Sequence, residues 1–136
     1  MRQVTERFVQ ATVRTAHHPW SPVLVRWRCA TADPLAVRMD FLFSGGGHPD
    51  VTWVFAADLL WRGLARPAGF GSVRIRPHST AETEVELTQD ATSCLVRMAT
   101  RPLRRFAAEA MARGHGCEER LRDELDAFLD RVLGPA

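Results

Sequence analysis

A few residues in the sequence combine types that can do chemistry. Cys117 lies two positions after His115, and a neighbouring imidazole can lower the pKa of a thiol and so activate it as a nucleophile. His17, His18 and His48 suggest metal binding, but no further histidine or acid stands at ligand spacing around them. The glycines on either side of His115 are typical of a turn between two helices. We therefore expect these residues to lie in a turn and in exposed loops, with no catalytic residue and no bound metal.

Phosphate and cofactor chemistry is also disfavoured. The three glycines at 45–47 could cradle a phosphate, but no Gly-Lys-Ser run follows, so we predict a hairpin loop. All 18 cationic side chains are arginine, and lysine and tyrosine are absent, which excludes a Walker lysine, a Schiff base and a phenolic acid. Cys29 and Cys94 fall at inward positions of predicted strands, which indicates buried thiols. The sequence predicts a protein that is not an enzyme and needs no cofactor.

Size and charge indicate one domain, residues 1–136, that works by meeting other proteins. The chain is 46% hydrophobic and has a net charge of +2, and no apolar stretch is long enough to span a membrane. No secretory leader is recognisable, so we expect a cytoplasmic protein without membrane insertion. Residues 118–133 carry six acids and three arginines, 3 − 6 = −3, which leaves +5 for the rest of the chain. A basic body with an acidic terminal helix suits protein partners.

Residue alternation predicts strands over most of the first hundred residues. Inward residues of two successive strands alternate with polar ones: Val23, Val25, Trp27 and Cys29, then Leu35, Val37, Met39, Phe41 and Phe43. Further strands are predicted at residues 4–14, 51–55 and 93–99. Residues 73–76 and 84–87 form a predicted hairpin, because one register places Ile75 opposite Val85 and also Arg76 opposite Glu84.

Helical periodicity follows in two places. Residues 56–64 form a short predicted helix, and the C-terminal third shows two apolar stripes separated by Gly114 and Gly116. The first stripe follows Thr100, a candidate helix cap, and the second includes Leu121, Leu125, Phe128, Leu129 and Val132. The sequence therefore predicts an α+β fold: an antiparallel sheet of about seven strands with one short helix and two C-terminal helices.

Candidate binding residues fall on two surfaces. The outward residues Arg26, Arg28, Arg38, Arg74, Arg76 and Arg97 would form a basic sheet face, which together with the tryptophans suits single-stranded nucleic acid. Glu84, Glu86 and Asp40 lie on the same predicted face and oppose that interpretation. Helical spacing favours burial of Trp61, whereas an exposed Trp61 would be a good interface anchor. For Trp20 the sequence leaves both burial and exposure open. The candidate partner-binding residues are Trp61, Arg62, Arg66, Pro67, Arg101, Arg104 and Arg105.

Several motifs in order resemble the SsgA-like family of sporulation and cell-division proteins of actinobacteria. The resemblance extends over residues 20–135 and is carried by the runs Thr31–Val37, Trp53–Ala56, Asp58–Leu60, Gly63-Leu64, Arg66-Pro67, Gly69, Gly71 and Val73–Ile75. In these motifs Asp33 and Pro34 are expected to build a turn, and Gly69 and Gly71 a loop. Trp53 and Phe55 are expected in the core, and Asp58 at the start of the short helix.

The resemblance implies a non-enzymatic regulator of sporulation-specific division. It implies an adaptor in septum-site selection that recruits the division GTPase FtsZ or guides cell-wall synthesis or autolysis, with FtsZ or other SsgA-like proteins as partners. It also implies a Whirly-like sheet, self-association as a homo-oligomer, with a trimer suspected, and a place at the division septum. A single-stranded nucleic-acid-binding protein is the alternative.

Overall fold

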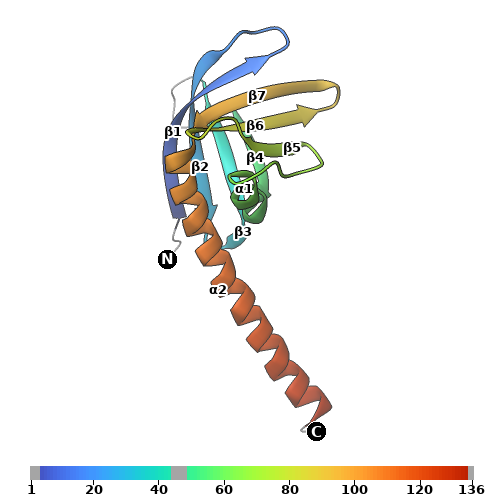
Figure 1. Ribbon diagram of the computed structural model, residues 1–136. Coiled ribbons are helices and arrows are strands. Elements are labelled where there is room, and N and C mark those ends of the chain that lie inside the picture. The colour runs from blue at the N-terminus through green and yellow to red at the C-terminus, as the bar shows by residue number, and fades with distance from the viewer. Residues whose placement is uncertain (1–3, 44–48, 135–136) are drawn as a thin grey trace.

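Seven antiparallel strands form one curled sheet, which carries a short helix and a long one (Figure 1). The computed structural model describes residues 4–43 and 49–134, so the predicted glycine loop at 45–47 and His48 lie outside it. The elements are β1 (Val4–Thr15), β2 (Ser21–Ala30), β3 (Asp33–Leu42), β4 (Val51–Ala56), α1 (Ala57–Gly63), β5 (Val73–Pro77), β6 (Glu82–Gln89), β7 (Thr92–Ala99) and α2 (Thr100–Leu133). The strand order is β4-β3-β2-β1-β7-β6-β5. The predicted α+β class and strand number are confirmed.

The core lies between the concave side of the sheet and the two helices. All four predicted inward residues of β2 are buried, as are Val37, Met39 and Phe41 of β3. The sheet is closed over by α1 and by the first half of α2, which contacts α1, β1 and β3. Leu35 and Phe43, also predicted to point inward, are instead about half exposed. Leu35 lies at the rim of the core beside Gly114 of α2, and Phe43 lies just beyond the last residue of β3.

The predicted hairpin is confirmed residue for residue. In the β5–β6 pair, Ile75 faces Val85 and Arg76 faces Glu84, the register that the sequence predicts. Ile75 also fixes the position of α1. A Cβ atom added at Gly63 would lie 2.4 Å from the Cβ of Ile75, so only glycine allows the end of α1 to approach β5 this closely. The register of the β5–β6 hairpin and the close contact of Gly63 with Ile75 therefore fix where the segment after α1 lies.

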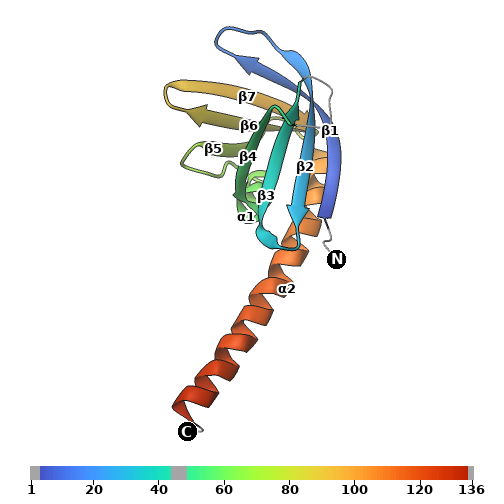
Figure 2. The same cartoon turned by 180° about the vertical axis from the view of Figure 1, so that it is seen from behind.

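The prediction of two C-terminal helices is wrong, because α2 is one helix of 34 residues (Figure 2). Gly114 lies inside it, and a Cβ atom there would lie 3.2 Å from Cδ2 of Leu35, so this glycine permits close packing against the start of β3. A glycine within a helix costs only about 1 kcal/mol relative to alanine, which is too little to end the helix by itself. Thr100 does not cap α2; its hydroxyl lies 2.7 Å from that of Thr83.

Beyond Gly116 the helix leaves the body of the protein. Figures 1 and 2 show this part of α2 projecting away from the sheet. Every residue from Glu119 to Gly134 is exposed, including the members of the second apolar stripe. We call residues 119–133 the projecting segment.

Candidate functional site

The helix α1 and the turn after it present an aromatic and basic surface. Trp61, Arg62, Arg66 and Pro67 are all exposed, and 42% of Trp61 is accessible to solvent. The expectation that Trp61 is buried is therefore wrong. The helix has only seven residues, and its buried side is occupied by Ala57, Leu60 and Gly63, which leaves Trp61 at the edge. We call these four exposed residues the α1 surface.

The charges around the α1 surface are only partly neutralised. Arg62 donates a hydrogen bond from Nε to Asp58, 2.8 Å away, and both side chains are more than half exposed. Asp58 lies in the first turn of α1, as expected, but does not cap it. Arg66 makes no ion pair with the residues that the structure describes. The surface thus offers an exposed indole and a guanidinium group that no described acid neutralises, and tryptophan and arginine are frequent anchors of protein interfaces.

The first two turns of α2 carry three further candidate residues, Arg101, Arg104 and Arg105, and all three are exposed. Helical spacing places Arg104 on the same side as Met111, which together with Asp58 lines a cleft between α1 and α2. Arg104 therefore extends the α1 surface. Arg105 shares a side with Glu109, which bonds Arg7 of β1, so Arg105 lies away from α1. Arg101 lies between these two directions, on the solvent side of the helix.

Two neighbouring features were not found by sequence reasoning. Phe70, in the loop between α1 and β5, is 96% exposed, and the glycines on either side of it are the sequence signal that it lies in a surface loop. The cleft between α1, α2 and the start of β3 measures about 370 Å³ and includes the apolar side chains of Leu35 and Met111. An aromatic tip and an apolar cleft beside the α1 surface both suit contact with a protein. Of the family-motif residues, Asp33 and Pro34 do not build the turn as expected but begin β3, because Asp33 already pairs with Ala30 of β2 and the turn is Thr31-Ala32. Trp53 and Phe55 pack half-buried against the core.

The outward sheet face is less basic than its arginines suggest, because buried acids neutralise them. Asp40 is fully buried and accepts hydrogen bonds from Nε of Arg28 at 2.6 Å and Nε of Arg26 at 2.9 Å. Arg28 donates a second hydrogen bond, from Nη2 at 3.1 Å, and the hydroxyl of Thr52 donates one at 2.7 Å. We call these four residues the Asp40 cluster. It joins β2, β3 and β4 and removes two cations from the surface that nucleic acid would need.

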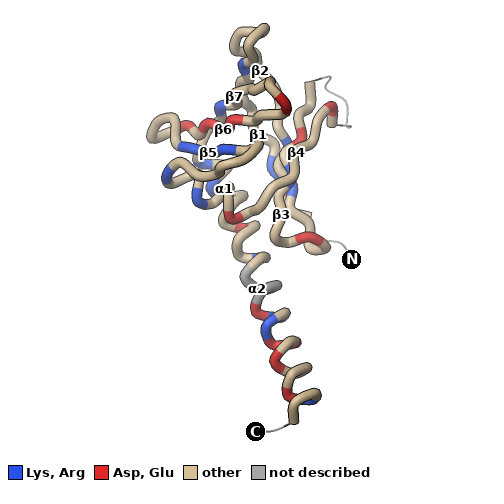
Figure 3. Tube along the Cα trace, turned by 90° about the vertical axis from the view of Figure 1, so that its right-hand side faces the viewer, with Lys and Arg blue, Asp and Glu red and all other residues tan. Residues whose placement is uncertain are grey.

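A second cluster does the same on the other half of the sheet. Glu84 accepts hydrogen bonds from Arg76 and Arg97, and Arg76 also bonds Glu86 at 2.9 Å. The guanidinium group of Arg97 lies 4.3 Å from the ring centre of Trp20, which is half-buried. Figure 3 shows further cationic segments near β5 and α1, and acidic ones along the projecting segment.

Acid is expected to weaken the fold through these two clusters. Burial raises the pKa of Asp40, but hydrogen bonds from Arg28, Thr52 and Arg26 lower it by more, so its pKa lies below the ordinary value. The pKa of Glu84 is lowered in the same way, by Arg97 and Arg76 against burial. A lowered folded-state pKa means stability that is present above the unfolded-state pKa and lost as pH falls. We expect the melting temperature to be level from pH 7 to about pH 5 and to fall below about pH 4. A level profile to pH 3 would contradict this prediction.

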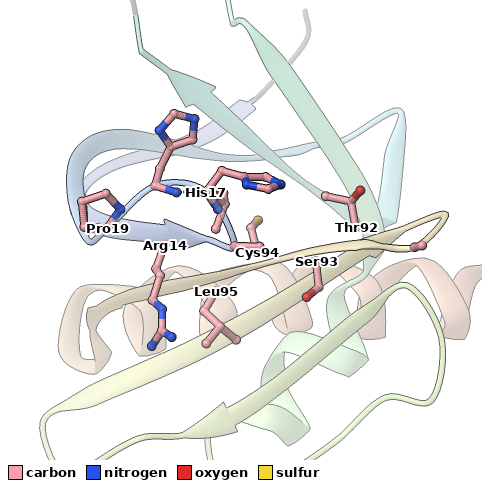
Figure 4. A pocket seen from close by; sticks show the side chains of 11 residues that line it. Arg14, His17, Pro19, Thr92, Ser93, Cys94 and Leu95 are labelled. Atoms are coloured by element: carbon pink, nitrogen blue, oxygen red, sulfur yellow. Dashed lines mark hydrogen bonds between the residues drawn. The ribbon is translucent and has the colours of Figure 1, made fainter.

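A hollow at the open end of the sheet is lined by polar side chains, but they do not converge into a catalytic or metal-binding arrangement. It measures about 830 Å³ and lies between the β1–β2 and β6–β7 turns. Figure 4 shows Cys94 and His17 on one side of the strands, and Arg14 and Leu95 on the other. Burial raises the pKa of the Cys94 thiol, which keeps it protonated. Within residues 4–43 and 49–134 no three metal-ligating side chains come together; the side chains of His115 and Cys117 lie outside the described part.

The fold and surfaces define a class: an α+β protein with a curled seven-stranded sheet and exposed aromatic and basic binding residues. Residues 23–118 match the family model described as Streptomyces sporulation and cell division protein, SsgA. The chain belongs to this family. It is 35% identical over 115 residues to the sporulation-specific cell division protein SsgB of Streptomyces coelicolor, with 82% of each chain covered. The SsgB protein of Salinispora tropica is 32% identical over 118 residues, covering 82% of this chain and 80% of that protein.

Solved structures agree with the family. One, described by the words "Mutations in SsgB correlate to longitudinal cell division during sporulation of Streptomyces coelicolor", has a TM-score of 0.68 and 31% identity and covers 82% of this chain and 87% of that chain. An SsgA-like sporulation-specific cell division protein from Thermobifida fusca has a TM-score of 0.73 at 22% identity, with 96% of each chain covered.

The match to SsgB of Kineococcus radiotolerans spans 41% of that protein. Among the described helices none is both apolar and long enough to cross a bilayer.

Proposed function

We propose that the protein regulates sporulation-specific cell division without catalysing a reaction, as an adaptor in septum-site selection. Its relatives are named sporulation-specific cell division proteins, which supports the cellular process. The observation that carries the adaptor role is the α1 surface, where Trp61 is exposed and Arg66 makes no ion pair with the described residues. Side chains of this kind anchor protein interfaces.

The partner of the α1 surface is a division protein that presents an acidic segment. Arg66 and Arg104 have no acidic partner in the described part of the chain, so a carboxylate from another protein would satisfy them. An apolar side chain from the same partner would fill the cleft beside Met111. FtsZ and other SsgA-like proteins are the proposed partners, in a homo-oligomeric assembly located at the division septum.

Replacing Trp61 with alanine is expected to weaken partner binding about tenfold or more and to leave the melting temperature nearly unchanged. An exposed anchor residue contributes about 2 kcal/mol or more to an interface, but a partly exposed indole contributes little to the fold. The measurement is titration of purified FtsZ and of a second SsgA-like protein with each variant, beside a melting curve. Phe8→Ala is the matched control, because Phe8 is also about half exposed but lies on β1.

The cellular arm of the experiment uses a sporulating strain that lacks the gene. Complementation with Trp61→Ala should leave septa misplaced, whereas Phe8→Ala should restore them. Normal septation with Trp61→Ala, or a fall in melting temperature that accounts for the defect, would count against the α1 surface. Normal septation in the strain without the gene would refute the cellular role. Salt-dependent binding of a labelled single-stranded oligonucleotide at about 50 mM salt would instead favour the nucleic-acid alternative.

A further inference from the structure

β4 is the last strand on one side of the sheet, and among the described residues it pairs only with β3 (Figure 2). In an antiparallel pair, half of a strand's backbone N–H and C=O groups point at the neighbouring strand and the other half point away from it. The outer side of β4 therefore carries a row of backbone donors and acceptors for which the described part of the sheet offers no strand. Such a row is a template for one more strand.

The sequence of β4 does nothing to protect this edge. Edge strands are usually protected by a proline, a charged side chain or a bulge. Residues Val51–Ala56 include no charge and no proline, and five of the six are β-branched or aromatic, the types that favour strands. Their register with β3 runs without a shift. All six residues are at least partly exposed, with Val51 at 45% and Val54 at 49%, so a partner can reach the edge.

The strand at the opposite end of the sheet is protected, which makes the open edge of β4 a specific feature. Ala68, in the loop after α1, exchanges two backbone hydrogen bonds with Ile75 of β5, at 2.9 and 3.0 Å. β5 also ends in Pro77, which has no N–H to donate. The chain thus covers one edge of the sheet with its own loop, and no described segment does the same for β4.

A groove along the open edge has room for a strand. Residues 51–54 form one wall, and the other wall includes Gly71, Ser72 and Thr88, where β5 begins and β6 ends. The groove measures about 630 Å³. A smaller space of about 300 Å³ adjoins it and is lined in part by Trp53 and Leu87. Because Leu87 belongs to the core, this space suits an apolar side chain from a strand that lies in the groove.

The charge of the groove favours a basic segment. Asp90, in the turn between β6 and β7, lines both spaces and is exposed. It makes no ion pair with a described residue. Although the chain has 18 arginines, none of those in the described part lines either space. A lysine or arginine from an added strand would therefore meet an uncompensated carboxylate.

We propose that β4 binds an extended segment of a partner protein as an additional strand, and that this segment carries both apolar and basic residues. Backbone hydrogen bonds to the outer side of β4 supply the affinity, and the side chains supply the selectivity. Residues 51–54 extend about 13 Å, so four or five residues of the partner cover the edge. None of the groove residues belongs to the α1 surface. The edge of β4 is thus a second binding site that goes beyond the proposed function.

Titration calorimetry and amide hydrogen exchange of the full chain test the proposal. The probe is an eight-residue peptide of alternating valine and lysine, blocked at both ends. We expect saturable binding that slows the exchange of the β4 amides, and at least tenfold weaker binding when glutamate replaces lysine. The same peptide with N-methylated amides should not bind, because it cannot donate hydrogen bonds to β4.

Three results would overturn the proposal. These are the absence of saturable binding, equal binding of the N-methylated peptide, and exchange of the β4 amides that does not change at saturation. A fourth concerns a different occupant. If the β4 amides become slow to exchange as the protein concentration rises without peptide, a second copy of the chain covers the edge and no partner segment is needed.

Substitutions in the groove locate the peptide. Val51→Lys places a cation on the edge and should weaken binding about tenfold. Val4→Lys is the matched control, because Val4 is also 45% exposed but lies on β1, and it should bind the peptide normally. Asp90→Asn should weaken binding about threefold; asparagine tolerates the φ of 57° at this position, so the turn is kept.

Unchanged binding by Val51→Lys would refute the site, and unchanged binding by Asp90→Asn would refute its preference for basic segments. Melting curves of all three variants show whether the fold is kept. Trp61→Ala should bind the peptide normally, and Val51→Lys should bind the partner of the α1 surface normally. Failure of the β4 site and failure of the α1 surface are therefore separate results.

Discussion

Replacing Asp40 with alanine is expected to lower the free energy of unfolding by about 4 kcal/mol, because removal of one partner from a buried ion cluster leaves the others without compensation. Asp40 is fully buried and holds Arg26, Arg28 and Thr52. The measurement is urea denaturation followed by tryptophan fluorescence. The three partners lie on β2 and β4, the two strands that flank β3, so removal of the Asp40 carboxylate should weaken the whole β2–β4 half of the sheet.

Asp58→Ala is the matched control for this prediction. Asp58 also pairs with an arginine, Arg62, but both side chains are more than half exposed. Exposed pairs of this kind contribute about 0.5 kcal/mol or less. Equal losses for the two variants would show that burial does not set the contribution of Asp40.

Replacing Phe106 with alanine should cost a similar amount, about 4 kcal/mol, since the change removes a large buried ring and leaves a cavity. Phe106 is fully buried on α2, and its ring centre lies 5.9 Å from that of Trp27 on β2. It therefore joins the first half of α2 to the sheet. Near-ultraviolet circular dichroism should also change, because the surroundings of Trp27 change.

The same substitution later in the same helix should have almost no effect on the monomer. Phe128 is 51% exposed and lies in the projecting segment, so Phe128→Ala removes no packing within one chain. Unfolding should be followed at low protein concentration. A large loss for Phe128→Ala under those conditions would mean that the segment contacts the body.

The sheet could be predicted from the sequence because its constraints are local and agree with one another. In the β5–β6 hairpin the apolar pairs and the charged pairs indicate one register, and a shift by one residue would turn every side chain to the wrong face. The alternating residues of β2 have the same property. What the pattern does not show is which part of a strand lies beyond the core, so Leu35 and Phe43 were placed inward.

The helices were harder to predict because their environment comes from distant residues. Gly114 and Gly116 indicate a turn when the sequence is considered alone, but Gly114 is required by Leu35, far away along the chain. Trp61 has the spacing of a buried residue, and only the shortness of α1 leaves it exposed. The sequence thus indicated which residues form the α1 surface. The exposure of Phe70 and the neighbouring cleft could not be predicted, because both depend on tertiary structure.

The continuity of α2 sets a length scale for any assembly. A helix of 34 residues extends about 50 Å, and its last part projects from the body beyond Gly116. The projecting segment therefore reaches about 20 Å beyond the body, far enough for a partner bound near its tip to leave the α1 surface accessible.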